Sequence, residues 1–334
     1  DSPPPPHRTT SPAMRHQIRT LAAILLTVVM TAGLVAPAAA GTVAPSLETE
    51  LMALTNAERT NRGLPELRGS LQMARIAREW SNTMATEQNL YHRPNLGQAV
   101  DGNWQRIGEN VGVGPNIPRI HQAFMDSPGH KANVLGDYTH VGVGVVEHDG
   151  RLWLTLNFLK GSGDFPVYRD VATTTHRTSI EGLFRRATTA GCQEARYCPN
   201  GSVTRAQMAT FLAKDLGLAP RTPEGYDDVS SRNVHYGNVG AVTAAGIATG
   251  CGSRAFCPDR PITRAEMAEW VAAAMRLSPV TPNFDDVAPS MSAAGAIGAL
   301  QKAGVVGGCT ATSYCPNASV NRGQMATFLT KAWS

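Results

Sequence analysis

Apolar residues recur three positions apart in three similar stretches of the C-terminal half of the chain. The pairs are Ile180 and Leu183, Val239 and Val242, and Ile297 and Leu300. Residues three apart share one face of an α-helix, so each pair predicts a helix with one apolar side. A second helix is predicted after each pair, because a helix-capping sequence opens a further apolar run. These openings are Thr204–Gln207, Thr263–Glu266 and Asn321–Gln324.

The same three stretches carry matching residues in a fixed phase. Cys192, Cys251 and Cys309 each follow a glycine, and their spacings of 59 and 58 residues indicate a true repeat. One helical hairpin cannot bury its apolar face alone, so we expect three to pack into an all-α pseudo-trimeric module. We assign the repeats to residues 166–219, 225–278 and 283–334.

The N-terminal half shows helical spacing first and strand patterns afterwards. Apolar residues at helical spacing are Leu51, Leu54, Leu71, Ala74 and Ala77. Arg62–Pro65 interrupts them as a helix stop, and a further helix is predicted at about 117–126. Val141–Val145 and Leu152–Leu156 are β-rich, with Asp149–Gly150 as a hairpin turn. Helices followed by strands predict an α+β sandwich over residues 46–160.

The start of the chain has the order of a secretory signal peptide. Arg15 and Arg19 precede an apolar run from Leu21 to Val35, and Ala38–Ala40 offers a cleavage site. We therefore predict a signal peptide at 14–40; a retained anchor is the alternative, although the apolar run is shorter than the roughly 20 residues of a membrane span. The Pro-rich residues 1–13 are interpreted as a non-native extension. The mature protein is thus expected outside the cell.

Charge excludes some classes of partner. The formal net charge is +4 at pH 7, from 30 basic and 26 acidic residues. No segment carries the dense Lys/Arg run of a nucleic-acid or membrane-surface binder, so neither partner is expected.

Six cysteines form three equally spaced pairs. In an exported chain this arrangement favours three local disulfides, each worth roughly 2 kcal/mol. Zinc is the alternative, although one pair per repeat supplies two ligands where a structural site takes four. The predicted disulfides are Cys192–Cys198, Cys251–Cys257 and Cys309–Cys315.

Each second helix is predicted to begin with an arginine: Arg205, Arg264 or Arg322. A cation at a helix start is unfavourable by about 0.3–1 kcal/mol because of the helix dipole. Three such arginines suggest an external use for the charge, such as pairing with an anionic ligand. The alternative is a solvated arginine, or a salt bridge to the acidic residue that opens each repeat. Those residues are Asp170, Asp228 and Asp286.

The repeats resemble the S-layer homology (SLH) family. The likeness rests on the aromatic-x-Asp-Val opening, the aromatic residue before Cys-Pro and the Thr-Arg-Ala-Glu/Gln helix start, over about 166–334. It implies non-covalent attachment to an anionic cell-wall polysaccharide. The resemblance also implies ligand contacts from the three helix-start arginines, with Asp170, Asp228 and Asp286 nearby.

Chemistry-bearing residues of the N-terminal domain are His92, Glu109, Ser127, His130, Asp137 and His140. His92 and His130 with a carboxylate could hold a divalent metal such as zinc, although their spacing matches no local metal motif. Ser127 and His130, three residues apart, could form a Ser-His pair oriented by Glu109, although no nucleophile-turn motif is present. The third possibility is a polar, hydrogen-bonded cleft without catalysis.

This domain resembles the bacterial branch of the CAP (SCP-like) superfamily. The matching motifs are Asn56–Arg59, Arg62–Pro65, the His92 loop, Gly108–Val111, Ser127–His130 with Asn133 and Leu135, Val141–Gly144, and Trp153. The resemblance implies an α-β-α sandwich with a central cleft lined by His and Glu. His92 and Glu109 match the family's first His and its Gly-Glu-Asn glutamate. Ser127 takes the second Glu position, and the last His position falls near Asp137.

Taken together, the sequence predicts a secreted cell-surface protein whose repeats bind wall polysaccharide and display a CAP domain. Because no catalytic constellation is complete, the cleft is expected to bind a small ligand or a protein partner, without a required cofactor. The alternative is a metal-dependent or Ser-His hydrolase acting on peptide or wall material. An inert surface-layer component is the third hypothesis.

Overall fold

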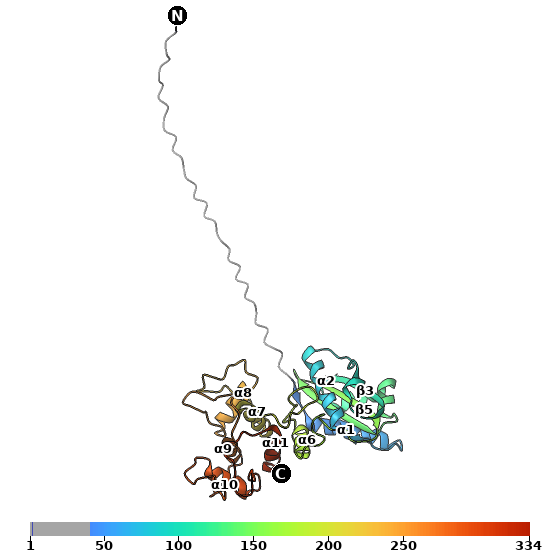
Figure 1. Cartoon of the computed structure of the whole chain (residues 1–334). Helices are drawn as coiled ribbons and strands as arrows, with labels where there is room; N and C mark the ends of the chain where they lie inside the picture. Colours follow the sequence, from blue (N-terminus) through green and yellow to red (C-terminus); the bar gives the residue numbers. More distant parts are fainter. Residues whose placement is uncertain (1, 3–40) are drawn as a thin grey trace. The chain divides into compact units, whose positions relative to one another are not determined.

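The computed structural model describes residue 2 and residues 41–334 (Figure 1). The predicted signal peptide at 14–40 lies outside the described residues, as does nearly all of the predicted extension at 1–13. The chain from residue 41 onward contains a mixed α/β domain and then a helical module.

A five-stranded sheet forms the centre of the first domain. Its strands are β1 (Thr42–Val43), β2 (Arg68–Gly69), β3 (Trp104–Gly114), β4 (His140–His148) and β5 (Arg151–Gly161). Their order is β1-β4-β5-β3, and β2 pairs with β4 as the only parallel neighbour among the described strands. The β4–β5 hairpin turns at Asp149 and Gly150, whose φ angles are 47° and 71°. Positive φ at both central positions is what a tight type I′ turn requires, which confirms the predicted hairpin.

Helices cover both faces of this sheet. They are α1 (Pro45–Thr60), α2 (Leu71–Glu87), α3 (Leu96–Ala99), α4 (Ile117–Asp126) and α5 (Pro128–Val134). Leu51 of α1 and Phe124 of α4 share a core with Val143 and Leu154 on one face. Side chains of α2 pack on the other face, where Trp80 meets Trp153. The α-β-α sandwich predicted from the sequence is therefore confirmed.

Two glycines let α2 lie very close to the sheet. A Cβ on Gly142 would come within 2.1 Å of the backbone nitrogen of Ala74, and one on Gly144 within 2.2 Å of the backbone nitrogen of Arg78. Both contacts are far shorter than any real packing distance, so the Val-Gly-Val-Gly pattern is needed for this helix–sheet contact.

The second half consists of three helix–loop–helix repeats. Their helices are α6 (Arg177–Arg185) and α7 (Arg205–Asp215), α8 (Tyr236–Ala244) and α9 (Arg264–Ala274), and α10 (Ala294–Lys302) and α11 (Arg322–Ala332). The second helix of each repeat packs on the first helix of the next, as α7 on α8, α9 on α10, and α11 on α6. One continuous hydrophobic core runs through all three repeats. This cyclic packing confirms the predicted pseudo-trimeric module.

A closed ring of backbone hydrogen bonds joins the repeats. The amide of Ile262 donates to the carbonyl of Val203 (2.9 Å), that of Val320 to Ile262 (3.1 Å), and that of Val203 to Val320 (2.9 Å). Each of these residues stands just before the helix start of its own repeat. The ring therefore brings the starts of α7, α9 and α11 together.

All three second helices begin with a complete capping box. Thr204, Thr263 and Asn321 each accept from the backbone amide three residues on, and the side chain there accepts from the cap amide. The helix starts predicted from the sequence are therefore confirmed, and Arg205, Arg264 and Arg322 are the first helical residues. Asparagine caps the third helix as threonine does the other two.

Candidate functional site

The three predicted disulfides, Cys192–Cys198, Cys251–Cys257 and Cys309–Cys315, are all present. Each closes a short loop between the two helices of its repeat. The second cysteine of each loop has a positive φ, for example 55° at Cys257, a conformation that few residues other than glycine adopt. A covalent link at this residue helps to hold that unusual backbone in place.

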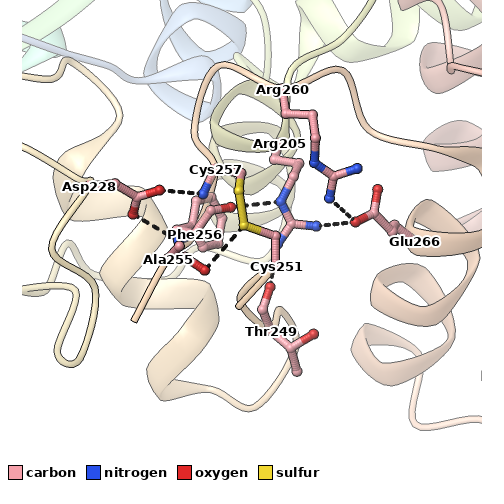
Figure 2. Close-up of a disulfide and its surroundings, with 9 residues drawn as sticks. All are labelled: Arg205, Asp228, Thr249, Cys251, Ala255, Phe256, Cys257, Arg260 and Glu266. Atoms are coloured by element: carbon pink, nitrogen blue, oxygen red, sulfur yellow. Dashed lines mark hydrogen bonds and ion pairs between the residues drawn. A yellow bond between two sulfur atoms is a disulfide. The ribbon is translucent and has the colours of Figure 1, made fainter. Parts of the chain in front are cut away.

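The acidic residue that opens each repeat holds the same loop. The carboxylate of Asp228 accepts from the amides of Phe256 (2.8 Å) and Cys257 (2.7 Å), as Figure 2 shows. Asp170 and Asp286 make the same two contacts in their own repeats. These carboxylates are loop-positioning groups, and the expected alternative of a salt bridge to the helix-start arginine is wrong.

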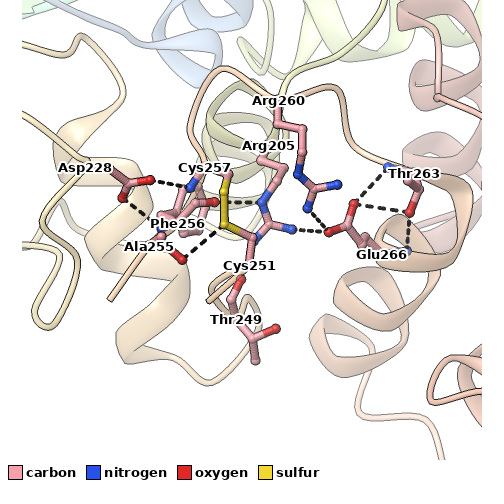
Figure 3. Close-up of polar contacts among 10 residues, drawn as sticks. All are labelled: Arg205, Asp228, Thr249, Cys251, Ala255, Phe256, Cys257, Arg260, Thr263 and Glu266. Atoms are coloured by element: carbon pink, nitrogen blue, oxygen red, sulfur yellow. Dashed lines mark hydrogen bonds and ion pairs between the residues drawn. A yellow bond between two sulfur atoms is a disulfide. The ribbon is translucent and has the colours of Figure 1, made fainter. Parts of the chain in front are cut away.

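Arg205 lies almost completely buried between the first and second repeats, with 1% of its surface exposed. Its Nε donates to the carbonyl of Phe256 (2.7 Å), Nη2 donates to the carbonyl of Thr249, and Nη1 donates to Glu266 Oε1 (2.6 Å). Figures 2 and 3 show this guanidinium between the disulfide loop and Glu266. The Cζ atom of Arg205 also lies over the rings of Phe256 and Trp270, 5.0 and 4.8 Å from their centroids.

The other two arginines occupy equivalent positions. Arg264 donates from Nε to the carbonyl of Tyr314 (2.7 Å) and from Nη2 to that of Gly307 (2.8 Å). Arg322 donates from Nε to the carbonyl of Tyr197 (2.7 Å). Each guanidinium also lies over the ring of the tyrosine to whose carbonyl it donates. The Cζ atom is 4.4 Å from the ring centroid for Arg264 and 4.6 Å for Arg322.

Burial is the largest influence on these three guanidinium groups, and it lowers the pKa of each. The expected alternative of a solvated arginine is therefore wrong. Carbonyl oxygens of the neighbouring repeat compensate each cation for its loss of water and for its position at a helix start. Contact with an external anion stays a prediction.

The residues that the sequence analysis matched to the family's cleft lie at β3, the strand at one end of the sheet path. His92 Nδ1 is 2.8 Å from Glu109 Oε1, and the amide of Arg93 donates to the same oxygen (2.9 Å). The Glu109 side chain is 7% exposed and that of His92 61%. The other carboxylate oxygen of Glu109, Oε2, is buried and has no hydrogen-bond partner within residues 41–334. The structure thus joins the two residues that the sequence analysis matched to the cleft.

His130 also lies against β3. Its carbonyl accepts from Asn110 Nδ2 (3.0 Å), and its ring packs on Phe124 at 5.0 Å. Burial, helped by the nearby charge of His92, lowers the pKa of His130. His130 and Ser127 both line a cavity of about 470 Å³ whose other walls include Leu90, Val113 and Ile120. This cavity is predominantly apolar.

The other candidates do not join this group. Ser127 and His130 make no side-chain hydrogen bond with one another in the described part of the chain. Asp137 pairs with Lys160. His140 is buried, bonds to Thr139 Oγ1 (2.9 Å) and packs on Phe165. Among residues 41–334 no group of three His, Cys, Asp or Glu side chains is arranged to hold a metal ion, so the donor set does not fit a catalytic zinc site.

Two groups of residues were not given a role from sequence. Asn133 donates to the carbonyl of Glu109 (3.1 Å) and to Asn110 Oδ1 (2.9 Å), and so braces the strand that carries the cleft glutamate. Glu266 binds both Arg205 and the partly exposed Arg260. The fourth residue of the capping box is glutamate only in the second repeat, whereas the other two repeats have glutamine. This difference was the sequence signal that could have pointed to a separate role for Glu266.

A sandwich domain with a cavity beside β3, followed by three cyclically packed helical repeats, defines a modular protein. Residues 52–158 match the family model of the Cysteine-rich secretory protein (CAP) family, and residues 225–268 and 283–326 match that of the S-layer homology domain. The chain is therefore a CAP-domain protein with SLH repeats. The structure adds the helix pair α6 and α7 as the remaining member of the repeat ring.

The relatives share parts of this chain. The uncharacterized protein YkwD of Bacillus subtilis is 34% identical over 115 residues, covering 32% of this chain and 44% of that protein. An endoglucanase of Bacillus sp. strain KSM-635 is 34% identical over 89 residues, covering 27% of this chain and 9% of the enzyme. An extracellular SCP-domain protein of Bacillus anthracis is 26% identical, with a TM-score of 0.32 over 35% of this chain and 41% of that one. The chain thus spans less than half the length of these relatives.

The SLH repeats place the protein outside the cell, at the cell surface. Within residues 41–334, none of the helices combines the length and apolar character that a membrane crossing requires.

Proposed function

We propose that the SLH repeats attach this protein non-covalently to an anionic cell-wall polysaccharide, and that the CAP domain binds a small ligand in its β3 cleft. The observation that carries the first part is the set of three guanidinium groups, one at each contact between repeats. Positive charge in a partly dehydrated groove attracts anions more strongly than the same charge in open solvent.

The wall attachment is tested by sedimentation with purified cell-wall sacculi. The chain is expected to sediment with untreated sacculi and to stay in the supernatant after hydrofluoric acid has removed their secondary polysaccharide. The control variant Arg254→Ala is expected to sediment as the unchanged chain does. It removes an exposed arginine of a disulfide loop, which pairs with Asp227 and lies outside the contacts between repeats. Sedimentation that survives the acid treatment would contradict the proposal.

The cavity beside His130 supports the second part. Its apolar lining suits a hydrocarbon or aromatic group, while the charged Arg119 at its wall suits a polar or anionic head. The unpaired, buried Glu109 Oε2 is an acceptor on β3, the strand whose residues 111–114 line the cavity. An amphipathic small molecule fits both features.

Binding in this cavity is tested with the amphipathic dye 8-anilinonaphthalene-1-sulfonate. Ala123→Trp places an indole in the cavity wall, whereas Gln122→Trp places one on the neighbouring exposed position outside it. We expect the first variant to lose most of the dye fluorescence and the second to keep it. Equal fluorescence in both variants would mean that the dye binds elsewhere.

The hydrolase alternative receives less support from the geometry. Ser127 lacks a hydrogen bond to His130 in the described chain, and a nucleophile needs a base within reach. Binding is therefore the function that the cleft supports best.

A further inference from the structure

The strand β3 keeps an open edge over its last four residues. Among the described strands it pairs with β5 alone, so its other side has no strand neighbour there. Near Glu109 this side is covered by α5, because Asn133 donates to the Glu109 carbonyl (3.1 Å). The next residue, Asn110, still bonds to the carbonyl of His130 (3.0 Å). Beyond it, Val111–Gly114 line the cavity of about 470 Å³.

The backbone groups of Val111 and Val113 have no partner on this edge within residues 41–334. In an antiparallel pair, alternate residues turn both their N–H and C=O groups toward the partner strand. The carbonyl of Glu109 turns away from β5, because it accepts from Asn133. Val111 and Val113 follow Glu109 in the same phase of the register, and no hydrogen bond from the rest of the described chain reaches their backbone. Two donors and two acceptors therefore stand beside the cavity.

This arrangement suits one kind of ligand best. Unpaired N–H and C=O groups along a strand edge are a template for another extended backbone. An extended peptide presents its own donors and acceptors every second residue, which is the spacing of Val111 and Val113. A hydrocarbon or a simple aromatic molecule could fill the cavity but would leave these groups unpaired.

The cavity also offers a place for one apolar side chain of such a peptide. A Cβ on Gly112 would meet Ile120 at 2.6 Å and Phe124 at 3.0 Å. One on Gly114 would meet Ile120 at 2.8 Å, so both glycines face α4. Directly opposite residues of paired strands place their side chains on the same face. A peptide residue opposite Gly112 would therefore place its side chain against Ile120 and Phe124.

The charge of the cavity wall specifies a second side chain. Arg119 lines the cavity, and its guanidinium forms no ion pair among residues 41–334. It directly precedes Ile120, the residue nearest to Gly114, so the cation lies at the Gly114 end of the edge. The described residues that line the cavity include no Asp or Glu. An acidic ligand group at this end would complement Arg119.

We propose that β3 binds an extended peptide along Val111–Gly114, with an acidic residue opposite Gly114 and an apolar residue opposite Gly112. The antiparallel direction follows from the slightly greater stability of such pairs, and it gives the peptide the pattern acidic-x-apolar-x. Main-chain hydrogen bonds then supply affinity and the cavity supplies specificity. This inference rests on the proposed ligand cavity and names the class of its ligand.

The probe is the tetrapeptide acetyl-Glu-Thr-Leu-Thr-amide, titrated into the whole chain labelled with ¹⁵N-valine. Nuclear magnetic resonance should show shifts of the Val111 and Val113 amide signals, because both N–H groups gain an acceptor. Each threonine stands opposite one of these valines, so N-methylation of either removes a donor to β3 and should weaken binding about tenfold. N-methylation of the leucine removes a donor that points away from β3. This matched control should bind as the unmodified peptide does.

Variants of the chain test the two side-chain contacts. Ala123→Trp fills the cavity and should abolish the response, whereas Gln122→Trp, on the neighbouring position outside it, should keep the response. Arg119→Gln should remove the preference of the chain for this peptide over one with glutamine in place of glutamate. An unchanged preference in Arg119→Gln would refute the acidic position.

Two results would overturn the inference as a whole. One is a set of valine signals that ignore the unmodified peptide, or equal binding of every N-methylated form. The other is a dimer of the chain that protects the Val111 and Val113 amides from hydrogen exchange, because a second copy would then occupy the edge.

The peptide and the cavity proposals fail in different ways. Dye fluorescence that Ala123→Trp removes, without any peptide response, would refute the peptide and leave a cavity for small amphipathic ligands. Absence of both responses would refute both proposals. A peptide response without dye binding would support strand pairing and refute the dye site.

Discussion

Tyr197 and Arg322 hold one another across the contact between the first and third repeats. The phenol of Tyr197 donates to the backbone carbonyl of Arg322 (3.0 Å), and the Arg322 guanidinium donates to the carbonyl of Tyr197 (2.7 Å). Tyr314 and Arg264 repeat this exchange across the contact between the second and third repeats. At the contact between the first and second repeats the equivalent residue is Phe256, whose side chain cannot donate.

The reciprocal pair predicts a loss of stability in Tyr197→Phe. The variant removes a buried hydrogen bond between two repeats, so the free energy of unfolding should fall by about 1 kcal/mol. Burial raises the pKa of Tyr197, which keeps the phenol a donor at any ordinary pH. Chemical denaturation followed by circular dichroism measures the change. Phe256→Tyr is the matched variant at the contact between the first and second repeats, and an equally large loss there would show that the effect is not specific to the hydrogen bond.

The disulfide loops predict a redox-dependent stability. Phe256, whose carbonyl accepts from Arg205, directly precedes Cys257. Replacing Cys251 and Cys257 together by serine therefore loosens both the loop and the contact between the first and second repeats. We expect a loss of roughly 2 kcal/mol, which a denaturation curve under oxidising conditions would measure. Adding reductant to the unchanged chain should shift its unfolding in the same direction. Identical curves with and without reductant would contradict a stabilising role.

The close approach of α2 to the sheet predicts a severe effect of Gly142→Ala. The added methyl group would overlap the backbone of Ala74, so the helix has to move away and the unfolding free energy should drop by about 1–3 kcal/mol or more. Gly129→Ala is the control, because its Cβ meets nothing within 4 Å. A similar stability of both variants would refute the packing argument.

Two histidines predict that the repeats lose stability in acid. His176 and His235 each share a hydrogen bond of 2.8 Å with a threonine of a neighbouring repeat, and burial lowers the pKa of both. For His235 the nearby Lys214 also lowers the pKa, and Asp259 opposes this shift. The unfolded chain then binds protons first as the pH falls through about 6.5, so stability is full above this value and declines below it.

Thermal unfolding between pH 5 and 8 measures this decline. Alanine occupies the equivalent position in the third repeat, Ala293, so the double change to His176→Ala and His235→Ala has a natural precedent. The double variant should show a flatter dependence on pH. A decline as steep as that of the unchanged chain would assign it to other groups.

The cleft geometry predicts that metal is not bound tightly. With fewer than three suitable ligands together in residues 41–334, the dialysed protein should hold well under one zinc per chain, and His92→Ala should not change this value. Elemental analysis settles the question. One zinc per chain, lost in both His92→Ala and His130→Ala, would instead support the hydrolase alternative.

The repeat module was largely predictable because its signals are local. The spacing of Cys251 and Cys257 and the capping box at Thr263 depend on residues within a few positions of one another. The burial of Arg205 was not predictable, because its main acceptor, the carbonyl of Phe256, lies 51 residues away. Every residue has a backbone carbonyl, so the sequence does not indicate which one accepts from Arg205.

The pairing of His92 and Glu109 was predictable only in part, because the two residues lie 17 positions apart in the sequence. His92 and Glu109 belong to separate motifs that resemblance alone brought together, and the structure places them 2.8 Å apart. His140 was a candidate from its neighbourhood in sequence, yet its side chain packs on Phe165, away from them. The side of the sheet to which the His140 side chain points depends on the register of β4, and the sequence pattern around His140 did not determine that register.

The ring through Val203, Ile262 and Val320 sets a limit on how this module can change in length. Because each of these amides donates to the preceding repeat and that of the first repeat donates to the last, a fourth copy would find no free partner and the loss of one copy would leave two open ends. Duplication or deletion of single repeats should therefore be selected against, and the copy number three follows from closure itself.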